Sequence, residues 1–168
     1  MTTLVYSTKC PRCTETGGRA HSFEWIGHLR DGVTNIFYTS LANSKDPEDS
    51  PDTLAGYLFH MQETRPYPWI WIVDCRGMKS KDLLCSGLGK ALTDIVQHTY
   101  IETLSGVYIL HPSIAMNALI QCIKPFLYKE TRQRIHLCSL GLIDTVNRLE
   151  SAGIPRTEMI TITKKIAS

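Results

Sequence analysis

The sequence lacks a long apolar run, because no stretch approaches the roughly eighteen residues that a membrane-spanning helix needs. The first residues, "MTTLVYSTKC", also lack the basic segment followed by an apolar one that is typical of a secretory signal. The net charge is small as well, because 18 basic residues nearly balance 16 acidic ones and leave a net charge of +2. That balance argues against a broad basic surface for nucleic acid. We therefore predict a cytoplasmic protein without a nucleic-acid partner.

Motifs for catalysis or cofactor binding are also missing. The sequence contains no glycine-rich dinucleotide motif, no phosphate-binding P-loop and no HExxH zinc motif. Asp74 ends the apolar run "WIWIVD", but no nucleophile and base are paired near it, and we expect a solvated strand end there. The sequence thus predicts a protein that is not an enzyme and has no cofactor.

Six cysteines could form three disulfides, yet most of them favour another role. Cys75, Cys85, Cys122 and Cys138 lie inside apolar strand or helix patterns, where thiols behave as small hydrophobic side chains. Only Cys10 and Cys13 stand apart, in "STKCPRC".

Strand and helix patterns alternate along the chain after Val33. Strands are expected at residues 33–41, "YPWIWIVD", "GVYIL", "RIHLC" and "TEMITIT", and helices at 51–63, 81–100, 113–124 and "LIDTVNRLESAG". Such alternation predicts an α/β fold with a mainly parallel sheet flanked by helices. We divide the chain into an N-terminal extension with a CxxC motif, 1–32, and one domain, 33–168.

The CxxC motif of Cys10 and Cys13 has three interpretations. A thiol redox pair would need a helix N-terminus after it, but two glycines follow instead. A zinc site would use His21 and His28, whose spacing departs from the usual one. We favour a structural or incidental role and predict no metal, keeping these four residues as weak candidates for zinc and the thiol redox protein as an alternative function.

The segment 113–124 predicts a helix with more apolar surface than docking on a sheet requires. Its polar side chains, Asn117, Gln121 and Lys124, share one narrow stripe, whereas a helix on a sheet needs an apolar stripe of only about 100°. The helix is either sandwiched between layers or covers a cavity that holds an apolar ligand.

Pro125 ends this helix, because proline lacks an amide hydrogen and clashes with the preceding turn. Four cations surround it within eleven residues: Lys124, Lys129, Arg132 and Arg134. They form either a solvated turn with local ion pairs or a surface for phosphate or an anionic membrane.

These stretches carry a family resemblance. "YIETLSGVYILHPS", the apolar helix and "IKPFLYKETRQRIHLCSL" together resemble the core of CRAL-TRIO lipid-binding domains, and the match extends more loosely over residues 33–165. The histidine-proline pair and "SLGLIDTVNRLESAGIP" are closer to the branch found in Rho GTPase-activating proteins and BCH adaptor domains.

The resemblance implies a parallel sheet as the floor of a lipid pocket and a mobile gate helix, residues 114–128, as its wall. The protein would bind or transfer a phospholipid, a phosphoinositide or an isoprenoid-like ligand without chemistry, with peripheral attachment to a membrane. The implied lipid-binding residues are Glu102, Arg134, Ile114, Ala118, Ile123, Phe126 and Leu127, and the membrane-facing basic residues are Lys124, Lys129 and Arg132. Arg134 stands where phosphoinositide-transferring members have a lysine, which keeps the charge but changes its geometry. The alternative is an adaptor of the BCH type that binds small GTPases or their regulators.

Overall fold

The computed structural model describes residues 10, 13, 22–40, 51–62, 64, 66–77, 94–138 and 141–167. Its elements are β1 (Glu24–His28), β2 (Asn35–Ser40), α2 (Pro51–Gln62), β3 (Trp69–Asp74), β4 (Leu104–Leu110), α5 (Ile114–Ile123), η2 (Lys124–Phe126), α6 (Lys129–Arg134), β5 (Ile135–Cys138), α7 (Leu142–Ser151) and α8 (Arg156–Ala167). Residues 94–99 are helical too. The rest of the helix expected at 81–100 and the zinc candidate His21 lie outside the described residues.

The five strands form one sheet in the order β1-β2-β3-β4-β5. Strands β2 to β5 are parallel, and β1 pairs with β2 in the antiparallel direction. The predicted α/β fold with a mainly parallel sheet is therefore confirmed. Since β1 lies before residue 33, the sheet begins within the segment that the sequence assigns to the N-terminal extension.

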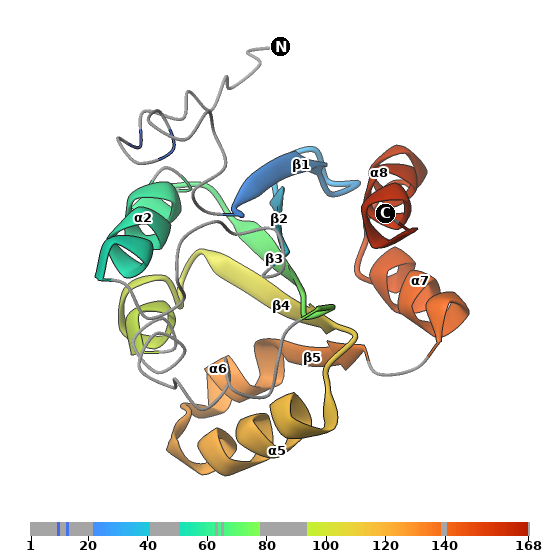
Figure 1. Cartoon of the computed structure of the whole chain (residues 1–168). Coiled ribbons are helices and arrows are strands. Elements are labelled where there is room, and N and C mark those ends of the chain that lie inside the picture. Colours follow the sequence, from blue (N-terminus) through green and yellow to red (C-terminus); the bar gives the residue numbers. More distant parts are fainter. Residues whose placement is uncertain are drawn as a thin grey trace.

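Alternate side chains of the strands enter two separate cores. Ile70 and Ile72 of β3 face α7 and α8, where they meet Leu149 and Ile162. Trp69 and Trp71 of β3 face the opposite way. They enter a cluster with Phe37 of β2, with Tyr57 and Met61 of α2, and with Val96 and Tyr100 in and directly after the helix at 94–99. Figure 1 shows α2 on one side of the sheet and the α7–α8 pair on the other. The sheet is thus the middle of three layers.

Residues 156–167, which contain the expected strand "TEMITIT", form a helix, so that prediction was wrong. Its β-branched residues favour a strand locally. However, Met159, Ile162 and Ile166 recur at intervals of three and four, which places them on one helical face, and all three are buried in the core beside β1 and β2. Tertiary packing of that face outweighs the local preference.

The turn expected after Pro125 contains a short helix as well. Residues 124–126 form the 3₁₀ helix η2, with Pro125 in its first turn, and α6 follows directly. The helix at 113–124 is confirmed as α5, which starts after the N-cap Ser113.

Candidate functional site

One face of the sheet carries apolar side chains that remain half-buried. Val73 of β3 pairs in register with Ile109 of β4, which pairs with Leu137 of β5. Two residues earlier, Val107 and Ile135 occupy the same face, and all five side chains are half-buried. We call these five residues the floor. On the opposite face of the same strands, Ile72, Leu110 and Cys138 are buried, whereas Tyr108 and His136 are half-buried.

The segment that connects β4 to β5 is the predicted gate, residues 114–128, which comprises α5, η2 and two further residues. A right-handed crossover between these parallel strands places it on the floor side of the sheet. In Figure 1, α5 lies beside α6 at the β5 end of the sheet, away from α7 and α8. The gate and the floor therefore belong to the same side of the molecule.

The gate begins at a constrained point. His111, directly after β4, has a φ of 50°, a left-handed conformation that costs a residue with a side chain about 1 kcal/mol. Its Nδ1 lies 3.4 Å from Oδ1 of Asp74 but without hydrogen-bond geometry. Two residues later, the Ser113 hydroxyl accepts a hydrogen bond from the amide of Met116 at 3.1 Å and caps α5. The chain thus turns sharply before a well-defined helix start.

Replacing Ser113 by alanine is expected to destabilise the start of α5 by about 1 kcal/mol, because the Met116 amide loses its acceptor. Hydrogen exchange of the α5 amides should then be about fivefold faster. The matched control is Ser151→Ala, because Ser151 is exposed and its hydroxyl bonds within α7 to the carbonyl of Asn147. Equal acceleration of exchange in both variants would show that the cap does not hold the gate.

The gate helix is only partly covered by the rest of the chain, since four of its nine described side chains are exposed and four are half-buried. Among its described side chains only Ile120 is buried, while Ile114 is 90% exposed and Ala118 and Cys122 are exposed too. Phe126 of η2 is 80% exposed. The helix is therefore not sandwiched between two layers. It displays a largely apolar outer surface, as expected from its narrow polar stripe.

The C-terminal end of the gate is attached to the helix at 94–99. Leu127 is buried, and the amide of Tyr128 donates to Oε1 of the buried Gln97 at 2.9 Å. The Tyr128 ring also stands edge-on to the ring of His98. These contacts fix the point at which the gate ends, whereas Ile114 and Phe126 remain exposed.

The predicted lipid-binding residues thus fall into three groups. Ile114, Ala118 and Phe126 lie on the outer surface of the gate, Ile123 is half-buried and Leu127 is buried. The structure does not gather these five apolar residues around one point.

Glu102 and Arg134 lie at the opposite end of β4, where the strand begins. Arg134 donates hydrogen bonds to the carbonyl oxygens of Ile101 and, at 2.6 Å, Leu104. These carbonyls flank Glu102, which is exposed. The predicted pair is therefore brought to one loop, with the guanidinium already bonded to the backbone of that loop.

The basic residues named for membrane contact stay close to the gate. Lys129 and Arg132 are exposed on α6, and Lys124 is half-buried at the start of η2. With the exposed Phe126 and Tyr128 between them, they form what we call the basic-aromatic edge: Lys124, Phe126, Tyr128, Lys129 and Arg132.

Asp74 is fully buried, so the expectation of a solvated strand end was wrong. Its carboxylate accepts hydrogen bonds from the Tyr38 hydroxyl at 2.7 Å and from Nη2 of Arg76 at 2.7 Å. Arg76 also donates to the carbonyl of Lys165 at 2.7 Å and so connects the end of β3 to the last turn of α8. The expectation failed because Tyr38 and the carbonyl of Lys165 come from distant parts of the chain, and only Arg76, two residues after Asp74, is a local partner.

The electrostatics of this cluster follow from burial and charge. Burial alone would raise the pKa of Asp74, but the hydrogen bonds from Arg76 and Tyr38 outweigh it and keep the pKa below its ordinary value. Burial and the hydrogen bond to this carboxylate raise the pKa of Tyr38. The cluster therefore holds a charged carboxylate and a neutral phenol, and it stabilises the structure beside the entry to the gate.

The two cysteines of the CxxC motif approach a histidine that the sequence did not single out. Cys10, Cys13 and His60 are all buried, and their ligand atoms lie within 4.8 Å of one another. His28 is elsewhere, in β1, with its ring edge-on to Trp25. No spacing rule could have found His60, because it follows Cys13 by 47 residues and lies in the last turn of α2.

Comparisons with known proteins agree with this architecture. The family model described as the CRAL/TRIO domain matches residues 35–147. The crystal structure of Sfh5 is similar, with a TM-score of 0.52 and 16% sequence identity over 75% of this chain and 50% of that chain. The present chain thus spans about half the length of Sfh5. No curated protein matches the sequence. In the part of the chain that the structure describes, no helix combines the length and the apolar character needed to cross a bilayer.

Proposed function

Because the chain belongs to the CRAL/TRIO family, whose membership supports a lipid-binding or transfer role in general, we propose that it binds a lipid between the floor and the gate without catalysing a reaction. The gate would open at an anionic membrane surface of the cytoplasmic side. The lipid classes that suit this arrangement are phospholipids, phosphoinositides and isoprenoid-like molecules.

The observation that carries the proposal is the floor itself. Its five aliphatic side chains lie side by side on three parallel strands and are only half-buried, although Val73 and Val107 also pack against the aromatic core. Covering apolar surface stabilises a complex by about 25 cal/mol for each Å² removed from water. An acyl chain laid along this face would supply that cover.

The location of Glu102 and Arg134 supports a polar end for such a ligand. Arg134 is bonded to two carbonyl oxygens at the start of β4 and so is held in a fixed place. A guanidinium can bind phosphate with two parallel hydrogen bonds, which suits a phosphorylated headgroup. The exposed carboxylate of Glu102 in the same loop would accept hydrogen bonds from headgroup hydroxyls.

A substitution that fills the space above the floor should remove the lipid. Leu137 lies on the edge strand β5, so Leu137→Trp adds bulk with little disturbance of the central strands. Overfilling typically costs 1–3 kcal/mol, and we expect the lipid that co-purifies to fall about tenfold or more. The measurement is mass spectrometry of an organic extract of the purified protein, beside uptake of lipid from vesicles.

The matched control is Ile143→Trp, because Ile143 is an exposed aliphatic residue on α7, on the other side of the sheet. This variant should retain the lipid content of the unmodified protein. Far-UV circular dichroism checks that both variants fold. A protein that yields no lipid on extraction and takes none from vesicles would contradict the proposal and favour the adaptor alternative.

A further inference from the structure

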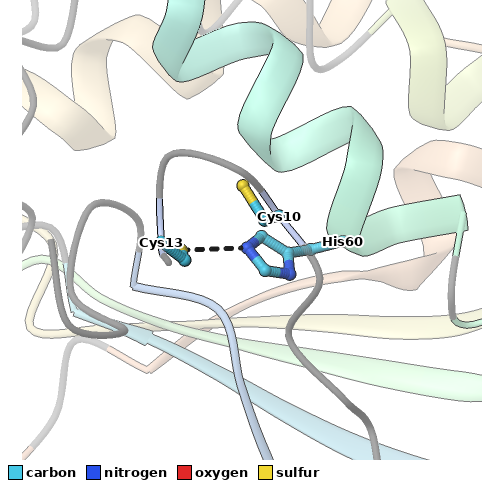
Figure 2. Close-up of side chains that lie close together, drawn as sticks. All are labelled: Cys10, Cys13 and His60. Atoms are coloured by element: carbon cyan, nitrogen blue, oxygen red, sulfur yellow. Dashed lines mark hydrogen bonds between the residues drawn. The ribbon is translucent and has the colours of Figure 1, made fainter. Parts of the chain in front are cut away.

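Cys10, Cys13 and His60 form a compact group outside the floor and the gate. All three side chains are buried, and Sγ of Cys13 lies 3.4 Å from Nε2 of His60. Figure 2 shows both cysteines beside the imidazole, which projects from α2. The group joins the N-terminal segment to α2, because His60 follows Cys13 by 47 residues. Neither cysteine is in a disulfide.

The spacing of these atoms matches the ligand shell of a tetrahedral zinc ion. With a Zn–S distance of about 2.3 Å and a Zn–N distance of about 2.0–2.1 Å, neighbouring ligand atoms lie about 3.5–3.8 Å apart. At 3.4 Å, the distance from Sγ of Cys13 to Nε2 of His60 is just below that range, and all ligand atoms lie within 4.8 Å of one another. Side-chain shifts on the order of 1 Å would therefore close the shell around an ion.

The chemistry of the donors narrows the choice of metal. Two thiols and one imidazole are soft or intermediate ligands, and no carboxylate takes part. Such a set selects zinc over magnesium or calcium, which prefer oxygen ligands. The CxxC spacing supplies two thiolates from one short loop, as in many structural zinc sites.

Neighbouring rings hold the histidine in position. The ring of Phe23 is nearly parallel to that of His60, with centroids 6.0 Å apart, and the Phe59 ring stands edge-on to it at 6.0 Å. Phe59 also packs against both cysteines. An apolar surround of this kind limits the access of bulk solvent to the ligands and the orientations of the imidazole.

We propose that Cys10, Cys13 and His60 bind a zinc ion that fastens the N-terminal segment to α2. The two thiols lose their protons to solvent on binding, and the neutral imidazole binds through Nε2. Water or a group beyond the described residues completes the tetrahedron. The site is independent of lipid binding, since it uses none of the floor or gate residues.

The test uses the full chain, kept reduced, freed of metal with a chelator and titrated with Zn²⁺ or Co²⁺. We expect one ion per chain and, for Co²⁺, the visible absorption of a tetrahedral site with thiolate charge-transfer bands. Cys10→Ser, Cys13→Ser and His60→Gln should each weaken Zn²⁺ binding by at least about a hundredfold, since even changes to groups that only hydrogen-bond to a ligand cost about 10–100-fold.

Two controls remove the same chemical groups elsewhere in the chain. Cys122→Ser removes an exposed thiol of α5, and His28→Gln removes the histidine of β1. Both variants should bind Zn²⁺ as the unmodified protein does. Failure of the unmodified protein to bind one ion of either metal, or equal losses in these controls, would overturn the proposal. Formation of a Cys10–Cys13 disulfide that cycles with a thiol reductant while no metal binds would point to a redox pair instead.

Loss of a ligand could impair folding, and far-UV circular dichroism checks each variant for this. A variant that replaces one ligand by another keeps the test informative in that case. His60→Cys offers a third thiolate, so Co²⁺ should still bind and its charge-transfer absorption should rise by about half, in proportion to the number of thiolates. A Co²⁺ spectrum unchanged from that of the unmodified protein would show that residue 60 is not a ligand, and the proposed site would be wrong.

Discussion

Asp74→Asn is expected to lower the free energy of unfolding by about 3 kcal/mol, the lower end of the range for breaking a buried ion pair. The carboxylate is completely buried, whereas the side chain of its partner Arg76 is 36% exposed and can regain some hydration. Asparagine preserves the shape but removes the charge that Arg76 and Tyr38 bind. Chemical denaturation of both proteins at neutral pH measures the difference.

The matched control is Glu24→Gln, which removes the carboxylate of an exposed ion pair with Lys165 at 2.7 Å. Exposed pairs contribute about 0–1 kcal/mol, so this variant should be nearly as stable as the unmodified protein. Both carboxylates are connected to Lys165 in the last turn of α8, Glu24 directly and Asp74 through Arg76, and they differ greatly in burial. Equal losses in the two variants would contradict the role assigned to Asp74.

The same residue predicts a pH dependence. Because the pKa of Asp74 is lowered in the folded protein, its contribution to stability is complete above the ordinary carboxyl value of about 3.9. It is lost as the pH falls below that value toward the lowered pKa. The unmodified protein should therefore lose stability more steeply than Asp74→Asn as the pH is reduced below about 4, and the gap between their unfolding curves should narrow.

Removing the charges of the basic-aromatic edge is expected to weaken binding to anionic vesicles about a hundredfold. The variant combines Lys124→Gln, Lys129→Gln and Arg132→Gln. Each basic residue near an anionic surface contributes about 1 kcal/mol, and three of them together give about 3 kcal/mol. Cosedimentation with phosphatidylcholine vesicles, with and without phosphatidylserine, measures the change.

A second triple variant with the same net charge separates this surface from the overall charge of the protein. Arg148→Gln, Arg156→Gln and Lys164→Gln remove three exposed cations from α7 and α8, on the opposite side of the sheet. Vesicle binding should change by only a few-fold, since charges beyond a Debye length of about 8 Å are screened. Similar losses in both triple variants would show that no particular edge meets the membrane.

Much of the architecture could be predicted because the relevant signals are local. The unbroken apolar run in β3 indicates a strand covered on both faces, and Trp69 to Ile72 are indeed buried. The apolar excess of α5 likewise predicts a helix that its own chain does not fully cover, and Ile114 is the extreme example. These patterns involve neighbours in the sequence, so they can be read without knowledge of the fold.

The errors concern residues whose environment depends on distant partners. Asp74 resembles a solvated strand end in the sequence, because the Tyr38 hydroxyl that bonds it and the Lys165 carbonyl that holds its neighbour Arg76 are far away along the chain. The segment of α8 has a strand-like composition, and only its packing beside β1 and β2 makes it helical. His60 joins the cysteine pair across 47 residues, a separation to which no motif corresponds. Contacts of this kind follow from the topology rather than from sequence spacing.

The aromatic cluster between the sheet and α2 has a consequence for optical experiments. All three tryptophans of the chain belong to it, with Trp69 and Trp71 buried and Trp25 packed at its margin. Indole emission therefore reports mainly on the half of the protein that includes the gate side of the sheet. Loosening of α7 and α8 would change the fluorescence little. Far-UV circular dichroism, by contrast, reports on the helices and strands of the whole molecule, so coincidence of the two unfolding curves is a direct test of its cooperativity.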